Sequence, residues 1–585
     1  MELDGSVIHL LTRRRTEPAK GAGPRASGRL AASLASGALL LVCTASRAAT
    51  YYVRTDGGSA AQCTGSIDAP YPGSGSSQPC AWNHPFQALP PLGVPRIAGG
   101  DTLWIRSGAY RMGYGAPGAE ACEAAGSFDC TMAPVPSGTG PAARTRIRGG
   151  SSASRCIDPP ELWGAERPWW VVDLDGSDHV ELSCLEITDH SQCIEFHNAA
   201  GPPCPGCAVP CERDTPPYGD WASLGLYAED AEDVRLVDLS IHGLAAGGVR
   251  AGRLTDWTVE RVRIVANGSV GWDGDLGGPS SSSGDLVFRH FEVAWNGCAE
   301  TWPGEQVRLD TCWAQEAGGY GDGVGLADSQ GDWLFEDSWF HHNTSDGLDL
   351  LYLVAPSSVT LRRVLAHGNA GNQLKVAGPA TIVNTLAVGD CAYFDGRTSL
   401  MGGGDHCRAF GAALALAPFQ GDATTVVNST FAGQGDCLVE VGCRDGSCDG
   451  SETVAFTNDL FAGDVDWRQP WELACLYWPD PNLPVDPTSF DENLFWRLKD
   501  DPCPGTATVC GQDPRLADDD LASFDANLLA ESPARDAGTA TGAPADDLWG
   551  RPRSGAPDLG AIEYGTCFLD GFETGGTSRW SNTAS

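Results

Sequence analysis

The most constraining feature of this sequence is an internal repeat. Residues 333–343 align without a gap with residues 359–369, an offset of 26, and the same offset places residues 348–350 over residues 374–376. Similar offsets join Val324 to Leu348 (24), Leu226 to Val249 (23) and Leu361 to Val383 (22). Short alternating strands recur in each period with no helical pattern between them, so each coil must bury its inward side chains against the neighbouring coils. The repeat therefore predicts a β-solenoid.

Composition and a recurring asparagine agree with this fold class. Of 585 residues, 74 are Gly and 39 are Pro, 19% are charged and 42% are hydrophobic. Turn formers this frequent leave little room for long amphipathic helices, and the hydrophobic fraction suffices for a large core. Asparagines recur beside small residues where a strand ends, which predicts a stacked ladder at one turn of each coil: Asn267, Asn296, Asn343 and Asn369. We expect an all-β chain.

The first 48 residues are typical of a secretory signal peptide. Basic residues precede an apolar stretch over residues 30–44, and a small-residue site ends at Ala48. That stretch is shorter than the roughly 20 residues that span a bilayer, so we expect a secreted chain with no stable membrane insertion after signal removal. Most of the 22 cysteines should then form disulfides. Cys204, Cys207 and Cys211 have zinc-like spacing, but disulfide bonding is the favoured interpretation.

The net charge excludes two classes of partner. A formal charge of −38 offers no basic face for nucleic acid or for an anionic membrane. The basic residues are unevenly divided, with 35 Arg and three Lys, which are Lys20, Lys375 and Lys499. Arg does not lose its proton in proteins, whereas Lys can become a base where a neighbouring cation or burial lowers its pKa.

Both ends of the mature chain resemble those of secreted right-handed parallel β-helix proteins. The motifs are residues 51–54 and 99–110 at the start, and residues 532–538 and 557–564 at the end. The resemblance implies a right-handed parallel β-helix with irregular, disulfide-containing loops. We divide the chain into a signal peptide (1–48), an N-terminal cap with the first strands (49–165), regular coils (166–470), C-terminal coils and the helix end (471–565), and a tail (566–585).

The repeat assigns side chains to the outside of the coils. If Val249, Val324, Leu348 and Leu374 face inward, strand alternation points the following residues outward in one column: Arg250, Gly325, Asp349 and Lys375. A second column, two residues before those inward positions, holds Asp322, Asp346 and Asn372. Three carboxylates and one lysine are thus predicted to meet on three successive coils. Crowded carboxylates favour Ca²⁺, and a bound cation would lower the pKa of a neighbouring lysine.

Residues 346–350 and 372–378, with Asp322 one coil earlier, are similar to the calcium and base motifs of the family-nine pectate lyases. The resemblance implies that Asp322, Asp346 and Asp349 bind Ca²⁺ and that Lys375 is the general base of a β-elimination. The family has a further Asp where this chain has Ser345. Arg250 is a candidate contact for a distal sugar, because its guanidinium can bind a carboxylate through two hydrogen bonds.

The sequence predicts a secreted, monomeric, calcium-dependent lyase acting on an acidic polysaccharide. Two alternatives stay open. The chain could be a glycoside hydrolase that uses paired carboxylates such as Asp322 and Asp346. It could also be a non-catalytic exported protein that binds carbohydrate, in which Asp349 and Lys375 form an ordinary cross-strand salt bridge.

Overall fold

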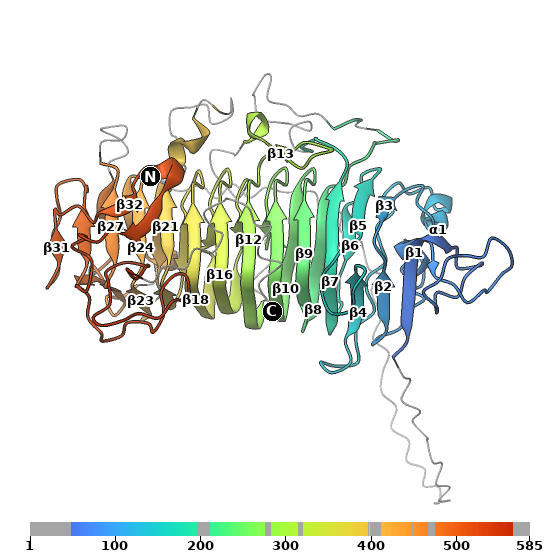
Figure 1. Cartoon of the computed structure of the whole chain (residues 1–585), viewed down its shortest axis with the longest axis horizontal. Coiled ribbons are helices and arrows are strands. Elements are labelled where there is room, and N and C mark those ends of the chain that lie inside the picture. Colours follow the sequence, from blue (N-terminus) through green and yellow to red (C-terminus); the bar gives the residue numbers. More distant parts are fainter. Residues whose placement is uncertain are drawn as a thin grey trace, which may run out of the picture. The chain divides into compact units, whose positions relative to one another are not determined.

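The computed structural model describes residues 48–565, except residues 196–210, 214, 275, 277–281, 314–319, 396, 398–406, 408–410, 420, 447 and 466–473. The expected signal peptide, the C-terminal tail, Cys204 and Cys207 lie outside these residues. The described chain is a right-handed parallel β-helix, built on one continuous sheet of 29 strands. Strands of successive coils lie side by side from β1 to β31 (Figure 1).

The sheet bends into three parallel ladders, which we name PB1, PB2 and PB3. PB1 comprises β6 (Trp170–Asp173), β8 (Leu224–Glu232), the first part of β10 (Gly247–Val265), β11 (Trp272–Asp273), β15 (Val324–Gly325), β17 (Leu348–Leu350), β19 (Leu374–Ala377), β22 (Leu414–Ala417), β25 (Cys437–Val441) and β28 (Cys475–Pro479). PB2 comprises β1 (Thr50–Gly58), β2 (Thr102–Ile105), β4 (Thr145–Gly149), β7 (Val180–Asp189), β9 (Arg235–His242), the later part of β10, β12 (Ser283–Ala294), β16 (Ser329–His341), β18 (Leu353–His367), β20 (Ala380–Val383), β23 (Ala423–Val427), β26 (Thr453–Thr457) and β29 (Thr488–Asp491). PB3 comprises β3 (Ala109–Gly113), β5 (Glu161–Ala165), the C-terminal parts of β7, β9, β10, β12, β16 and β18, and then β21 (Leu386–Gly389), β24 (Thr430–Gly433), β27 (Leu460–Gly463), β30 (Leu494–Trp496) and β31 (Val509–Cys510).

The predicted coil register is confirmed except at one step. Val324 pairs with Leu348, and Leu348 pairs with Leu374, at the predicted offsets. The offset of 22 after Leu361 is wrong, because Leu361 pairs with Ile382, 21 residues on. Here PB2 turns into PB3 at a residue with positive φ in each coil, 53° at Arg363 and 51° at Asn384. These two corners stack on each other and are 21 residues apart, one residue fewer than the predicted offset. Ile382, and not Val383, therefore pairs with Leu361 and points into the core.

The interior of the coils is apolar except for the asparagine ladder. Phe288, Phe335 and Leu361 stack inward in PB2 and are at most 1% exposed. The predicted ladder is confirmed. Hydrogen bonds of 3.0, 2.9 and 2.8 Å between side-chain amides join Asn267, Asn296, Asn343 and Asn369 in order. All four are fully buried, and the donated amide protons satisfy acceptors that a turn inside the coil would otherwise leave unpaired.

Few described elements lie outside the three ladders. They are the helix α1 (Glu120–Ala124), the 3₁₀ turns η1 (Pro85–Gln87), η2 (Leu309–Thr311), η3 (Cys391–Phe394), η5 (Arg444–Gly446) and η6 (Leu521–Ser523), and two antiparallel pairs, β13 (Ala299–Glu300) with β14 (Val307–Arg308) and β32 (Leu516–Asp518) with β33 (Asp525–Leu528). Apolar side chains of the C-terminal segment, including Leu516 and Leu528, pack on the outer face of PB3. Among the described residues no helix has the length and apolar character needed to cross a membrane.

Disulfides close loops that leave the coils, and one of them, between Cys437 and Cys475, joins the paired strands β25 and β28. All 18 described cysteines are paired, in nine disulfides. Cys211 pairs with Cys193, so it is not part of a zinc site with Cys204 and Cys207. Disulfides in this number are typical of exported proteins and consistent with secretion.

Candidate functional site

The outward column that the sequence predicts is present on PB1 and is longer than predicted. Arg250 pairs with Asp273, which pairs with Gly325, and the register continues through Asp349 to Lys375. The strands are only two to four residues long here, so each coil contributes one residue to the column, and at Gly325 that residue has no side chain. Since adjacent coils are about 4.8 Å apart, Asp349 and Lys375 are direct neighbours.

Lys375 and three aspartates form one compact cluster. The Lys375 Nζ lies 2.8 Å from Asp346 Oδ2 and 3.0 Å from Asp349 Oδ2. Oxygen atoms of Asp322, Asp346 and Asp349 all lie within 4.8 Å of one another, and the three residues are 3–6% exposed. The predicted ligands and the predicted base are therefore brought together.

Backbone amides fix the direction of each carboxylate. Asp322 Oδ1 accepts a hydrogen bond of 3.0 Å from the backbone N–H of Asp346, and Asp346 Oδ1 accepts one of 2.7 Å from the backbone N–H of Asn372. Asp349 Oδ1 accepts one of 2.9 Å from the N–H of Leu351. One oxygen of each aspartate is thus held by the backbone, and for Asp346 and Asp349 the other oxygen binds Lys375.

The charges of the cluster are strongly coupled. Burial, and then the charges of Asp346 and Asp349, raise the pKa of Asp322 to about 7. Burial also raises the pKa of Asp349, although Lys375 opposes it. Burial alone would lower the pKa of Lys375, but the three aspartates outweigh it and raise the pKa well above its ordinary value. Without a further cation, Lys375 is therefore protonated.

The cluster fits a hard divalent cation. Carboxylates that converge on one point repel each other, and Ca²⁺ takes oxygen ligands from flexible sites of this kind. Ser345 hydrogen bonds through its side chain to Asp322. It therefore orients one of the three carboxylates and adds no negative charge.

A second group of converging ligand atoms is formed by Glu186 and His242 on PB3 and by Glu305 in the loop between β13 and β14. His242 Nδ1 lies 2.8 Å from Glu300 Oε1, and its Nε2 lies 3.2 Å from Glu186 Oε1. Burial would lower the pKa of His242, but hydrogen bonds to Glu186 and Glu300 raise it to about 10. A protonated imidazole between glutamates accounts for this group without a metal ion.

Arg250 is not part of the cluster. It lies in the same column but four coils from Lys375, and its Nε is 3.6 Å from Asp273 Oδ2. Its guanidinium therefore faces the neighbouring carboxylate, at a place where only a long polymer chain could reach both Arg250 and Lys375.

Six residues of the column were not predicted from the sequence. Asp173 and Tyr227 precede Arg250, Asp273 lies between Arg250 and Gly325, and Ala415, Glu440 and Trp478 follow Lys375. A repeated offset of 23 from Val249 would have found the coil of Asp273. Glu440 was hidden because residues 390–413 separate its coil from that of Lys375. Burial, and then the charge of Asp436, raise the pKa of Glu440 to about 8.

Comparison with known proteins gives remote structural similarity only. No known family model matches the sequence, and no curated protein matches it. The chain is similar to a solved structure of the pectate lyase Pel9A, with 14% identity, a TM-score of 0.40 and coverage of 88% of this chain and 96% of that one. It is also similar to the complex of XylC with xylose, with 10% identity, a TM-score of 0.39 and coverage of 88% of this chain and 99% of that one. A third similar structure is an alginate lyase from Paenibacillus sp. str. FPU-7, with 11% identity, a TM-score of 0.26 and coverage of 65% of this chain and 91% of that one. Similarity this remote says nothing about activity.

Proposed function

We propose that this protein is a secreted, calcium-dependent polysaccharide lyase that cleaves a pectate-like uronate polymer by β-elimination. The observation that carries the proposal is the position of Lys375, whose Nζ lies within 3.0 Å of two carboxylates in a cluster of three. The cluster lies on an outward column of PB1, where an extended polymer can lie across successive coils. The residues of the cluster are the ones whose sequence motifs resemble the calcium and base motifs of the family-nine pectate lyases.

In the proposed reaction, Lys375 removes the proton at C5 of the uronate. The C5–H electron pair forms the C4–C5 double bond, the C4–O bond breaks, and the leaving oxygen takes a proton from water. Asp322, Asp346 and Asp349 would hold Ca²⁺. The chemistry that this ion supplies when bound is neutralisation of the substrate carboxylate and of the three aspartates, which makes the C5 proton more acidic.

Lys375 can accept a proton only after it has lost one. In the metal-free arrangement Asp346 and Asp349 keep it protonated, because they raise its pKa. Burial acts in the opposite direction, so neutralisation of these carboxylates leaves a buried lysine whose pKa falls. The same two aspartates therefore position the amine and set whether it is a base.

The arrangement of the carboxylates favours cation binding over the hydrolase alternative. Carboxylate oxygens of Asp322 and Asp346 lie within 4.8 Å of each other, and Asp322 also holds the backbone N–H of Asp346. This geometry favours shared binding of a cation over separate acid and base roles.

The test follows the ultraviolet absorbance of unsaturated products formed from polygalacturonate in the presence of Ca²⁺. We expect absorbance to rise, Lys375→Ala to abolish the rise and Lys375→Arg not to restore it. Lys499→Ala is the matched control, since it removes a lysine from a C-terminal coil outside the cluster. Full activity of Lys375→Ala would refute the assignment of the base. New reducing ends without absorbance would indicate hydrolysis, and neither signal on polygalacturonate or alginate would indicate a binding protein.

A further inference from the structure

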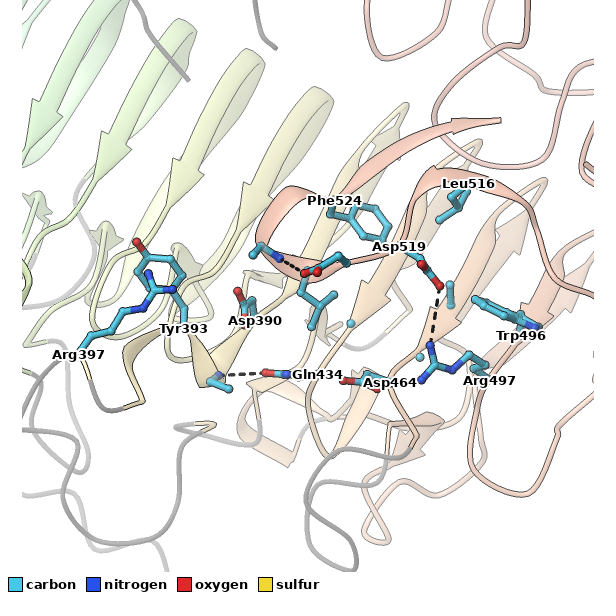
Figure 2. Close-up of a pocket in the computed structure, with 17 residues that line it drawn as sticks. Asp390, Tyr393, Arg397, Gln434, Asp464, Trp496, Arg497, Leu516, Asp519 and Phe524 are labelled. Carbon is cyan, nitrogen blue, oxygen red and sulfur yellow. Dashed lines mark hydrogen bonds and ion pairs between the residues drawn. The ribbon is translucent and has the colours of Figure 1, made fainter. Parts of the chain in front are cut away.

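A cavity lies away from PB1, where the strands of PB3 end. It has a volume of about 390 Å³, within the range of roughly 300–1,000 Å³ of small-molecule sites. Asp390, Gln434 and Asp464 follow β21, β24 and β27 on three successive coils and form one wall. The C-terminal segment around η6 forms the facing wall, with Leu516 and Phe524 (Figure 2). None of the cavity residues belongs to the candidate site.

The buried carboxylate of Asp390 indicates that the cavity is built for a ligand. Asp390 is 6% exposed, and its side chain accepts no hydrogen bond from any residue in the described part of the chain. Burial raises the pKa of Asp390 to about 6, although Arg397 opposes the shift. Its oxygens are not fully enclosed, so donors from a bound molecule can reach this carboxylate from the cavity. Figure 2 shows Asp390 between Tyr393 on one side and Asp464 on the other.

The remaining wall offers an aromatic surface and further polar groups. Trp496 is partly exposed at the end of the cavity opposite Tyr393 (Figure 2). The Gln434 Oε1 accepts a hydrogen bond of 3.0 Å from the backbone N–H of Ala392, which leaves the amide NH₂ of Gln434 as a donor toward the cavity. An aromatic plane beside hydrogen-bonding side chains suits a pyranose, whose C–H face stacks on a ring while its hydroxyls bind polar groups.

The charge of the cavity selects the class of sugar. Its charged residues are four aspartates and two arginines: Asp390, Asp464, Asp519, Asp520, Arg397 and Arg497. Arg497 is shared between Asp464, at 3.2 Å, and Asp519, at 3.9 Å, and Arg397 lies 4.0 Å over the ring of Tyr393. The excess of negative charge disfavours a uronate. Among the described residues these aspartates do not converge as a metal-binding group, so hydroxyl donors are the better partners.

We propose that this cavity is a second carbohydrate-binding site, which holds one or two units of a neutral glycan through stacking on Trp496 and hydrogen bonds to Asp390, Gln434 and Asp464. The site is independent of Lys375 and the aspartate cluster. It would bind a neutral chain or side branch while PB1 faces a charged polymer.

The test is calorimetric titration of the full mature protein with cellohexaose, xylohexaose, mannohexaose, maltohexaose and laminarihexaose, and with hexagalacturonate for comparison, all in EDTA. At least one neutral hexasaccharide should bind more tightly than hexagalacturonate. Trp496→Ala should weaken that binding about thirtyfold and Asp390→Asn about tenfold. Trp169→Ala is the matched control, because Trp169 is 48% exposed and lies outside the cavity.

Asp390→Asn preserves shape, so it keeps the test valid if Trp496→Ala fails to fold. Lys375→Ala should bind the neutral hexasaccharide as the wild type does, which separates this proposal from the lyase proposal. Absence of binding to all five neutral probes, tighter binding of hexagalacturonate, or unchanged affinity in both cavity variants would overturn it.

Discussion

Replacement of Lys375 by Met tests whether the cluster is an ion-paired unit that a cation can take over. The change removes the amine that neutralises Asp346 and Asp349 and leaves three carboxylates that are at most 6% exposed. Loss of one partner from a buried ion pair costs about 3–5 kcal/mol. Because the pKa of Asp322 is already raised to about 7, one carboxylate readily takes a proton, so we expect about 3 kcal/mol at neutral pH.

Equilibrium unfolding in urea, with a calcium chelator, measures the effect. Asp322 and Asp349 have pKa values above those of the unfolded chain, so the folded variant binds protons as the pH falls and its deficit shrinks. The loss should therefore be largest above about pH 7 and smaller near pH 5. Ca²⁺ at about 100 times its Kd should return about 2.7 kcal/mol to the variant, since it binds only the folded cluster.

Lys375→Arg is the control for charge, and it should retain most of the stability while lacking lyase activity. Two results would refute the reasoning. One is a Lys375→Met protein as stable as the wild type at pH 8 in chelator. The other is a deficit that Ca²⁺ leaves unchanged, which would mean that the three aspartates do not act as one cation site.

Three further predictions concern the rest of the molecule. Burial raises the pKa of Glu440 to about 8, so the folded wild type loses stability as the pH rises from the ordinary glutamate pKa toward 8. The urea midpoint of Glu440→Gln should therefore rise relative to that of the wild type over this pH interval. A difference between the two midpoints that does not change with pH would contradict this. Asn343→Ala removes four buried hydrogen bonds and should cost about 4 kcal/mol in urea unfolding, whereas a loss below about 1 kcal/mol would show that the ladder is dispensable. Asp546→Ala removes the acceptor of hydrogen bonds from Arg362, at 2.6 Å, and from Arg363, at 2.9 Å. The variant should show faster proteolysis of the C-terminal segment while the coils stay intact. An unchanged cleavage rate would mean that the apolar contacts of the segment hold it without these ion pairs.

The coil register was predictable because inward positions are apolar and recur at nearly constant spacing. The alignment of Leu348 with Leu374 therefore placed Asp349 beside Lys375 without reference to the structure. The register failed at Val383 because a side-chain pattern does not record where the backbone turns. Arg363 and Asn384 both adopt positive φ at that corner, and the coil between them is one residue shorter than the pattern suggested.

The composition of the cluster was more predictable than its electrostatics. The repeat offsets and the alternation of inward and outward residues along each strand were enough to identify Asp322, Asp346, Asp349 and Lys375. The direction of the pKa shift of Lys375 depends on distances of 2.8 and 3.0 Å and on burial, which no spacing gives. The cavity beside Asp390 was also hidden, because its facing wall comes from residues that are far along the chain.

The placement of the disulfides determines how the coils respond to force. Among the described residues each disulfide closes a stretch of 5 to 38 residues, so none joins distant coils. A pull applied at Ala48 and Tyr564 would meet the ion pairs that hold Asp546 to Arg362 and Arg363, and then mainly the hydrogen bonds and stacked side chains between neighbouring coils. At one step, between β25 and β28, the disulfide of Cys437 and Cys475 also joins the two coils. The solenoid would then lengthen in steps, one coil at a time. The residues enclosed by an intact disulfide would not add to the extended length.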